Sequence, residues 1–105
     1  MKEVTVSDLK FLIDKKADFQ LIDVREPHEY EICNLGGNSI PLSTIPDNFE
    51  KIDRNKQVII HCRSGARSGQ AVSWLEKTHG YNNVYNLKGG ILAWANEIDP
   101  SFPKY

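Results

Sequence analysis

Short apolar runs rich in β-branched residues alternate along this chain with segments in which apolar residues recur at helical spacing. The clearest run is Val-Ile-Ile at residues 58–60, and this pattern predicts a buried strand. A small basic loop with a glycine follows it, and then Ala71, Trp74 and Leu75 recur at the spacing of one helix face. Strands that alternate with helices favour an α/β fold built on a parallel sheet.

The same signals place the other elements. Residues 7–16 are predicted to form a helix with Ser7 as its N-cap, because serine is favoured there and the two lysines at its end suit a helix C-terminus. Pro27 is expected at the first position of a second helix, and Gly80 just after the end of the helix that follows the basic loop. We predict the following further elements: strands over residues 3–6, 19–25 and 83–87, a short helix over residues 43–52, and a proline-rich tail over residues 98–105 that extends over the surface.

The cysteine at the end of the central strand is the leading candidate for chemistry. Cys62 stands between that strand and a helix N-terminus, where open α/β folds place their active sites. The thiolate is the nucleophile, and both a helix N-terminus and nearby arginines lower the pKa of a thiol. We expect the backbone N–H groups of Gly65 and Ala66 to turn inward around an anion. Arg63 and Arg67 add donors for an oxyanion. The alternative is a buried structural cysteine, which would not need two arginines within five residues.

Charged residues end a second predicted strand at the same edge of the sheet. We expect Asp23, which is followed by Arg25, to support the loop by accepting hydrogen bonds from its backbone or from an arginine. The alternative is a helix cap or a surface ion pair. His61 precedes Cys62, but neighbours in an extended strand point to opposite sides, so His61 is a poor candidate for a proton-relay base. Activation of the thiol is therefore expected from loop amides and arginines.

Composition narrows the class of protein. The 105 residues, 40% hydrophobic and 26% charged, suit one compact domain over residues 1–105. A net charge of −1 gives no sign of a nucleic-acid or membrane partner. No apolar run approaches the ~20 residues of a membrane span and no secretion signal follows Met1, so a reducing, cytoplasmic setting is expected. Cys33 and Cys62 could pair, but nothing in their spacing indicates a disulfide framework or a zinc site. Cys33 is expected to pack as a small apolar group, with a role as a resolving thiol as the alternative.

The chain resembles the rhodanese (sulfurtransferase) family. The resemblance rests on a six-residue loop that begins with cysteine and ends with arginine: Cys62, Arg63, Ser64, Gly65, Ala66 and Arg67. It extends to the Asp-Val-Arg of residues 23–25 and to the Leu-x-Gly-Gly and Ala-Trp of residues 87–94. Residues 33–42 match it only in part, because four of them depart from the commonest form: Cys33, Asn34, Gly36 and Asn38. The resemblance implies a small, mainly parallel sheet with helices on both faces. It also implies transfer of a sulfane sulfur through a persulfide on Cys62, with no metal or organic cofactor.

The resemblance also implies the reaction partners. The sulfur donor would be thiosulfate or a persulfide, whose oxyanion the loop arginines would bind, and the acceptor would be a thiophile. The tail is similar to the end of rhodanese domains fused behind the adenylyltransferases that activate molybdopterin-synthase and thiamine sulfur carriers. A sulfur-carrier protein or a fused adenylyltransferase is therefore an expected partner, and the chain is either a stand-alone or an excised version.

Two other functions stay open from the sequence. Cysteine phosphatases also use a His-Cys pair and a loop that ends in arginine followed by serine or threonine, as in His61–Cys62 and Arg67–Ser68. Their loop has five residues between cysteine and arginine, whereas this chain has four, and a shorter ring of amides suits a sulfur better than a phosphoryl group. A phosphatase also needs an acid for its leaving group, and Asp23 is the one candidate that stays open. The second alternative is a docking module whose cysteine is idle.

Overall fold

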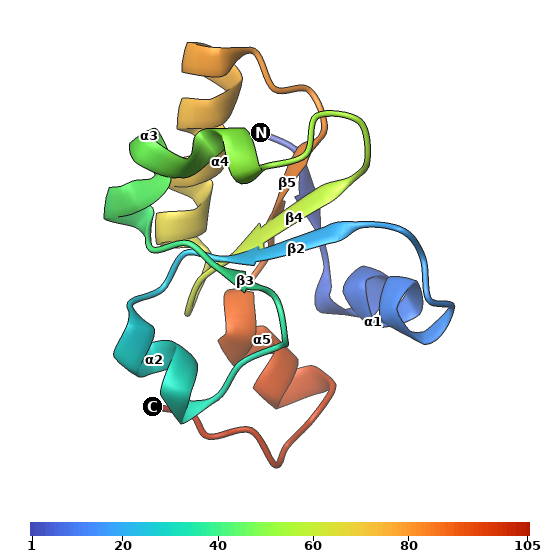
Figure 1. Cartoon of the computed structure of the whole chain (residues 1–105). Helices are drawn as coiled ribbons and strands as arrows, with labels where there is room; N and C mark the ends of the chain where they lie inside the picture. Colours follow the sequence, from blue (N-terminus) through green and yellow to red (C-terminus); the bar gives the residue numbers. More distant parts are fainter.

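The computed structural model describes residues 1–105 and is built around a five-stranded parallel sheet (Figure 1). The strands lie in the order β1-β5-β4-β2-β3, so β4 is central. Their bounds are as follows: β1 Glu3–Val4, β2 Gln20–Asp23, β3 Asn38–Ser39, β4 Val58–His61 and β5 Val84–Leu87. Every neighbouring pair is parallel, which confirms the predicted parallel sheet.

Helices cover both faces of the sheet. Their bounds are as follows: α1 Val6–Asp14, α2 Pro27–Ile32, α3 Ile45–Asn48, α4 Ala66–His79 and α5 Gly90–Glu97. Figure 1 shows α3 and α4 on one face and α1 and α5 on the other. Side chains of β4 alternate between the two faces, because Val58, Ile60 and Cys62 belong to one buried cluster and Ile59 to the other. A central strand that is apolar on both sides needs helices on both faces.

The strands predicted over residues 3–6, 19–25 and 83–87 are one to three residues shorter in the structure. Two predicted helices also differ. The first helix begins at Val6 and its N-cap is Thr5, not Ser7. The Thr5 hydroxyl accepts from the N–H of Asp8 at 3.1 Å, and the Asp8 carboxylate accepts from the N–H of Thr5 at 2.9 Å. This reciprocal pair satisfies two backbone donors that a cap at Ser7 would leave open. The predicted helix over residues 43–52 is broken into α3 and the 3₁₀ turns Leu42–Thr44 and Phe49–Lys51.

The C-terminal ends of the parallel strands meet at one edge of the sheet. Strands β2, β4 and β5 end there at Asp23, His61 and Leu87, and the loops that follow lead into α2, α4 and α5. Cys62 comes directly after β4, so the candidate loop lies at this edge. No helix of the structure combines the length and the apolar character that crossing a membrane requires.

Candidate active site

The sulfur of Cys62 lies among hydrogen-bond donors. The residue is 1% exposed and belongs to the buried apolar cluster that also contains residues of α4. Its Sγ accepts from the N–H of Gly65 at 3.1 Å, from the N–H of Ser68 at 3.4 Å and from the hydroxyl of Ser68 at 3.3 Å. Cys62 is therefore buried, as a structural cysteine would be, but its sulfur is held by polar groups as a reactive one would be.

These donors set the charge state of the thiol. Burial raises the pKa of Cys62, because a thiolate loses the solvation of bulk water. Hydrogen bonds from Ser68, Gly65 and Ser64 outweigh that cost, so the pKa lies below its ordinary value. Ala66, whose N–H was also expected to face the sulfur, begins α4 and makes no hydrogen bond to Sγ. Stabilisation of the thiolate thus comes chiefly from one serine and the N–H groups around it.

Helix α5 holds the loop from outside. The N–H of Ile91 donates to the carbonyl of Cys62 at 3.0 Å, and the N–H of Leu92 donates to the carbonyl of Arg63 at 3.1 Å. With these carbonyls turned toward α5, the N–H groups that follow can turn toward the sulfur. Gly90 permits this approach, because a Cβ there would lie 2.5 Å from the carbonyl oxygen of Arg63. Its φ of +61° also lies in the region that favours glycine.

Arg67, one of the two arginines of the loop, is paired with α2. Its guanidinium donates to the two carboxylate oxygens of Glu29 at 2.7 and 3.0 Å. Glu29 is 7% exposed, and these hydrogen bonds are the main cause that lowers the pKa of its carboxyl to about 2. The positive charge of Arg67 is also attracted to a thiolate at Cys62. Arg67 therefore ties the loop to α2 and adds positive charge near the sulfur.

Arg63 is held by the C-terminal tail. Its Nε donates to the main-chain carbonyl of Tyr105 at 2.7 Å, and its Nη2 donates to the same oxygen. The ring of Tyr105 lies over the guanidinium, with its centroid 5.1 Å away. The tail was predicted to extend over the surface, but its last residue contacts the loop. Sequence reasoning missed this contact because 42 positions separate the two residues.

Asp23 supports the region through Arg25 rather than through the loop. The Asp23 carboxylate accepts from the backbone N–H of Arg25 at 3.0 Å and from its guanidinium at 2.7 to 3.1 Å. Both side chains are buried, so the alternative of a surface ion pair was wrong. Arg25 also donates to the hydroxyl of Tyr105 and to the carbonyl of Cys33, each at 2.7 Å. No hydrogen bond joins Asp23 to residues 62–67.

His61 is buried on the side of β4 opposite to Cys62. Its ring nitrogens have no hydrogen-bond partner, and Nε2 lies 3.8 Å from the carboxylate of Asp23. Burial is the main cause that lowers the pKa of His61 to about 4, so the ring is neutral near pH 7. This placement agrees with the expectation that His61 is not a proton-relay base for the thiol.

Comparison with known proteins gives the family. Residues 5–97 match the rhodanese-like domain. The chain belongs to this family. It is 36% identical over 96 residues to a protein named sulfurtransferase from Allochromatium vinosum, and the match covers 90% of this chain and 89% of that protein. Among solved structures, a rhodanese-like domain protein from Staphylococcus aureus matches 93% of this chain and 95% of its own, with a TM-score of 0.82 and 33% identity.

Some relatives carry the rhodanese-like domain within a longer protein. The chain is 38% identical over 98 residues to the adenylyltransferase and sulfurtransferase UBA4 of Debaryomyces hansenii, and the match covers 81% of this chain but 21% of that protein. The chain spans less than two thirds of several curated relatives that it matches. The resemblance of this chain to the rhodanese domains of adenylyltransferase-sulfurtransferases is thereby confirmed.

Two polar residues beside the sulfur of this rhodanese-like domain were not among the sequence candidates. Ser68 is fully buried in the first turn of α4, and Asn86 is 4% exposed on β5. The Ser68 hydroxyl lies 2.5 Å from Oδ1 of Asn86, whose Nδ2 donates to the carbonyl of Gly65 at 3.1 Å. One sequence signal was available for Asn86, because it is a polar residue inside a short, otherwise mainly apolar strand.

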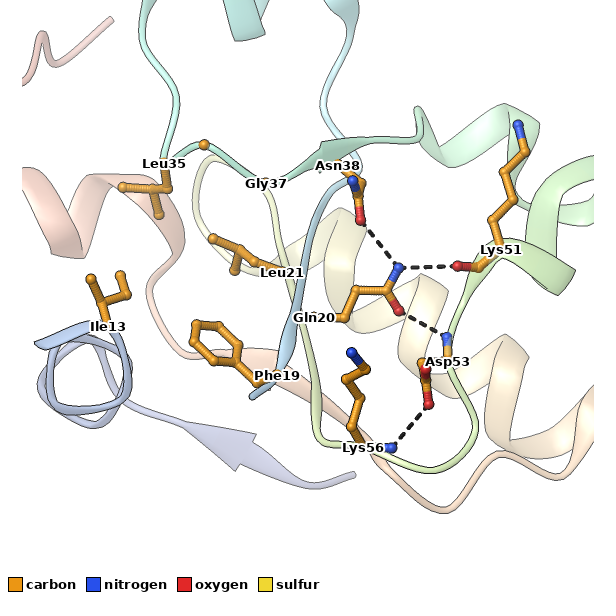
Figure 2. Close-up of a pocket in the computed structure, with 11 residues that line it drawn as sticks. Ile13, Phe19, Gln20, Leu21, Leu35, Gly37, Asn38, Lys51, Asp53 and Lys56 are labelled. Carbon is orange, nitrogen blue, oxygen red and sulfur yellow. Dashed lines mark hydrogen bonds between the residues drawn. The ribbon is translucent and has the colours of Figure 1, made fainter. Parts of the chain in front are cut away.

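One cleft of the molecule lies away from this loop. It has a volume of about 510 Å³ and surrounds Gln20, which begins β2 at the opposite end of the sheet from Cys62 (Figure 2). The Gln20 amide bridges to Asn38, to the carbonyl of Lys51 and to the N–H of Asp53. A shallower depression of about 610 Å³ runs along α4 and includes two loop residues, Gly65 and Ala66, in its wall. None of residues 62–67 lines the cleft in Figure 2.

Proposed function

We propose that the protein is a sulfurtransferase that moves a sulfane sulfur from thiosulfate or a persulfide donor to a thiophilic acceptor through a persulfide on Cys62. With thiosulfate as donor, the thiolate attacks the outer sulfur, the S–S bond of thiosulfate breaks, and sulfite leaves with the bonding electron pair. The enzyme then carries Cys62–S–S⁻, and an acceptor such as cyanide removes the outer sulfur as thiocyanate and restores the thiolate. The observation that carries the proposal is the set of donors directed at Sγ.

The partners of Arg67 and of Asp23, which are Glu29 and Arg25, support sulfur transfer over phosphatase chemistry. A phosphatase needs its loop arginine to bind the phosphoryl oxygens, but here Arg67 donates to both carboxylate oxygens of Glu29. It also needs an acid beside the leaving group. Asp23, the candidate that the sequence left open, is 1% exposed and its carboxylate is held by Arg25. Asp23 is therefore not free to act on a leaving group, and Arg67 would have to leave Glu29 to bind a phosphate ester.

Arg63 is the residue we assign to the donor's oxyanion. It is half-buried, and its Nε and Nη2 converge on one oxygen, the main-chain carbonyl of Tyr105. Two convergent guanidinium donors are also what an oxygen of thiosulfate would need. Binding of the donor at Arg63 would therefore exchange one oxygen acceptor for another. Arg67 would contribute its charge without direct contact.

We further propose a sulfur-carrier protein as a physiological acceptor, and a cytoplasmic location. The support for the acceptor is the occurrence of the domain in relatives named adenylyltransferase and sulfurtransferase. A resolving role for Cys33 stays the alternative to its expected packing as a small apolar group; the residue is half-buried, and its carbonyl accepts from Arg25.

A steady-state assay tests the proposed reaction. With thiosulfate and cyanide as the two substrates, we expect thiocyanate to form with ping-pong kinetics, because the sulfur is held on the enzyme between two half-reactions. Cys62→Ala should abolish the activity, whereas Cys33→Ala should retain it. A generic aryl phosphate in a parallel assay should release no phosphate. Release of phosphate without thiocyanate would replace this proposal by a phosphatase, and absence of both products would favour the docking module.

A further inference from the structure

The hydroxyl of Ser68 lies between two acceptors that it cannot serve at once. Its Oγ is 3.3 Å from Sγ of Cys62 and 2.5 Å from Oδ1 of Asn86. A serine hydroxyl carries a single proton, so it donates to one of these atoms at a time. Ser68 is fully buried, so no bulk water replaces the acceptor that it leaves.

Asn86 is fixed as an acceptor for this hydroxyl. Its Nδ2 donates to the carbonyl of Gly65 at 3.1 Å, and this directs Oδ1 toward Ser68. The opposite orientation of the amide would place two acceptors, Oδ1 and the Gly65 carbonyl, against each other. Because the side chain is 4% exposed, solvent has little part in this arrangement. Asn86 therefore offers the hydroxyl a second position that lies away from the sulfur.

The demand of the sulfur for this proton changes during the proposed reaction. In the free enzyme the negative charge of the thiolate sits on Sγ of Cys62, which then needs donors. In the persulfide Cys62–S–S⁻ the charge sits on the outer sulfur, and Sγ becomes a neutral atom with two covalent bonds. A neutral sulfur of this kind is a weak acceptor. The hydroxyl then gains more from a bond to an amide oxygen.

We propose that Ser68 is a catalytic residue whose hydroxyl donates to Sγ in the thiolate and turns to Oδ1 of Asn86 when the sulfur is loaded. Asn86 is a positioning residue that acts through Ser68. This inference rests on the proposed sulfur transfer. It follows that loss of Asn86 leaves the hydroxyl of the loaded enzyme buried without a good acceptor, which disfavours the persulfide relative to the thiolate.

A double-mutant cycle isolates this effect. The variants are Asn86→Ala, Ser68→Ala and the two together. The Gly65 carbonyl loses its donor whether or not Ser68 is present, so that loss cancels in the cycle. The first quantity is the equilibrium constant for loading Cys62, measured by intact mass in mixtures of thiosulfate and sulfite. The second is the pKa of Cys62, measured from the pH profile of its alkylation by iodoacetamide and read at the Cys62 peptide.

With Ser68 present, Asn86→Ala should lower the loading constant about tenfold, the effect of leaving a buried hydroxyl without an acceptor. In the Ser68→Ala background the same substitution should change it less than twofold. Ser68→Ala alone should raise the pKa of Cys62. The change that Asn86→Ala makes in the pKa of Cys62 should be more negative with Ser68 present than in the Ser68→Ala background. The reason is that the hydroxyl no longer has to leave an amide oxygen in order to donate to Sγ. The charged group that acts on Cys62, Arg67, is unchanged in all variants.

Equal effects of Asn86→Ala in the two backgrounds would overturn the proposal, because Asn86 would then act through the Gly65 carbonyl or the fold alone. An unchanged pKa of Cys62 in Ser68→Ala would also overturn it. If Asn86→Ala does not fold, Asn86→Leu, an apolar residue of similar size, is used in both backgrounds with the same expectations. If the wild type loads no sulfur, the proposed function fails, and the alkylation profiles alone decide whether the hydroxyl moves between sulfur and amide.

Discussion

Gly90 is the position at which the shape of the loop can be perturbed most sharply without touching the sulfur. A Cβ at residue 90 would lie 2.5 Å from the carbonyl oxygen of Arg63 and 2.6 Å from that of Cys62. These are the carbonyls that accept from the N-terminal N–H groups of α5. In Gly90→Ala the loop and the helix must move apart, so both hydrogen bonds weaken together. Gly80 is a matched control, because its φ of +66° is similar and no atom lies within 4 Å of its Cβ position.

The expected magnitudes follow from this comparison. Alanine in the left-handed region costs about 1 kcal/mol, and Gly80→Ala should lower the free energy of unfolding by that amount. Gly90→Ala bears the same cost and weakens two hydrogen bonds worth about 1 kcal/mol each, so its loss should be about 3 kcal/mol. At roughly 4 °C per kcal/mol, Tm should fall by about 4 °C in the first variant and about 12 °C in the second.

Thermal unfolding and the alkylation profile of Cys62 together test the reasoning. Gly90→Ala should also raise the pKa of Cys62 toward that of an ordinary thiol, because the N–H groups no longer converge on Sγ. Gly80→Ala should leave both this pKa and the rate of thiocyanate formation unchanged. Equal losses of Tm in the two variants, or an unshifted Cys62 pKa in Gly90→Ala, would refute the claim that α5 shapes the loop.

Three further predictions concern charge and the tail. The pKa of His61 is lowered to about 4 in the folded protein, so the free energy of unfolding should fall by about 3 kcal/mol as pH drops from about 6.5 to 4. In His61→Leu, the free energy of unfolding measured with urea should depend less on pH over that window. The pKa of Glu29 is lowered to about 2, so its contribution to the free energy of unfolding is present above pH ~4.5 and is lost as pH falls toward 2. Glu29→Gln should lower the free energy of unfolding at pH 7 by up to about 3 kcal/mol in the same measurement. A flat profile in the wild type across either window would contradict these assignments. Deleting Tyr105 should lower KM for thiosulfate about fivefold, because the donor no longer has to displace a carbonyl from Arg63, and a raised KM would contradict that competition.

The sequence allowed the sheet, its helices and the reactive loop to be predicted because these features follow from local patterns. The apolar run at residues 58–60 forms the buried part of β4. Gly89 and Gly90 form the turn into α5 that packs against the loop. Cap choice was harder, because Thr5 and Ser7 are both N-cap types and residue type alone favours serine. The partner three residues later, Asp8, decides between them.

The partners of the loop could not be predicted in the same way, because they are set by distant parts of the chain. Arg67 was expected at the donor's oxyanion, but α2 brings Glu29 to it across 38 positions. Asn86 reaches Ser68 only because β5 lies beside β4 in the sheet. The identity of such neighbours depends on strand order and on where the tail packs, which periodicity does not specify.

The central claim is that a buried sulfur, held by inward-facing donors, accepts and keeps one sulfur atom. Intact mass of the protein after incubation with thiosulfate and removal of small molecules tests it most directly, with peptide mapping to locate the change. The account predicts a gain of one sulfur at Cys62, retained in Cys33→Ala and removed by cyanide. A wild-type protein of unchanged mass, or a sulfur found on Cys33 instead, would contradict it.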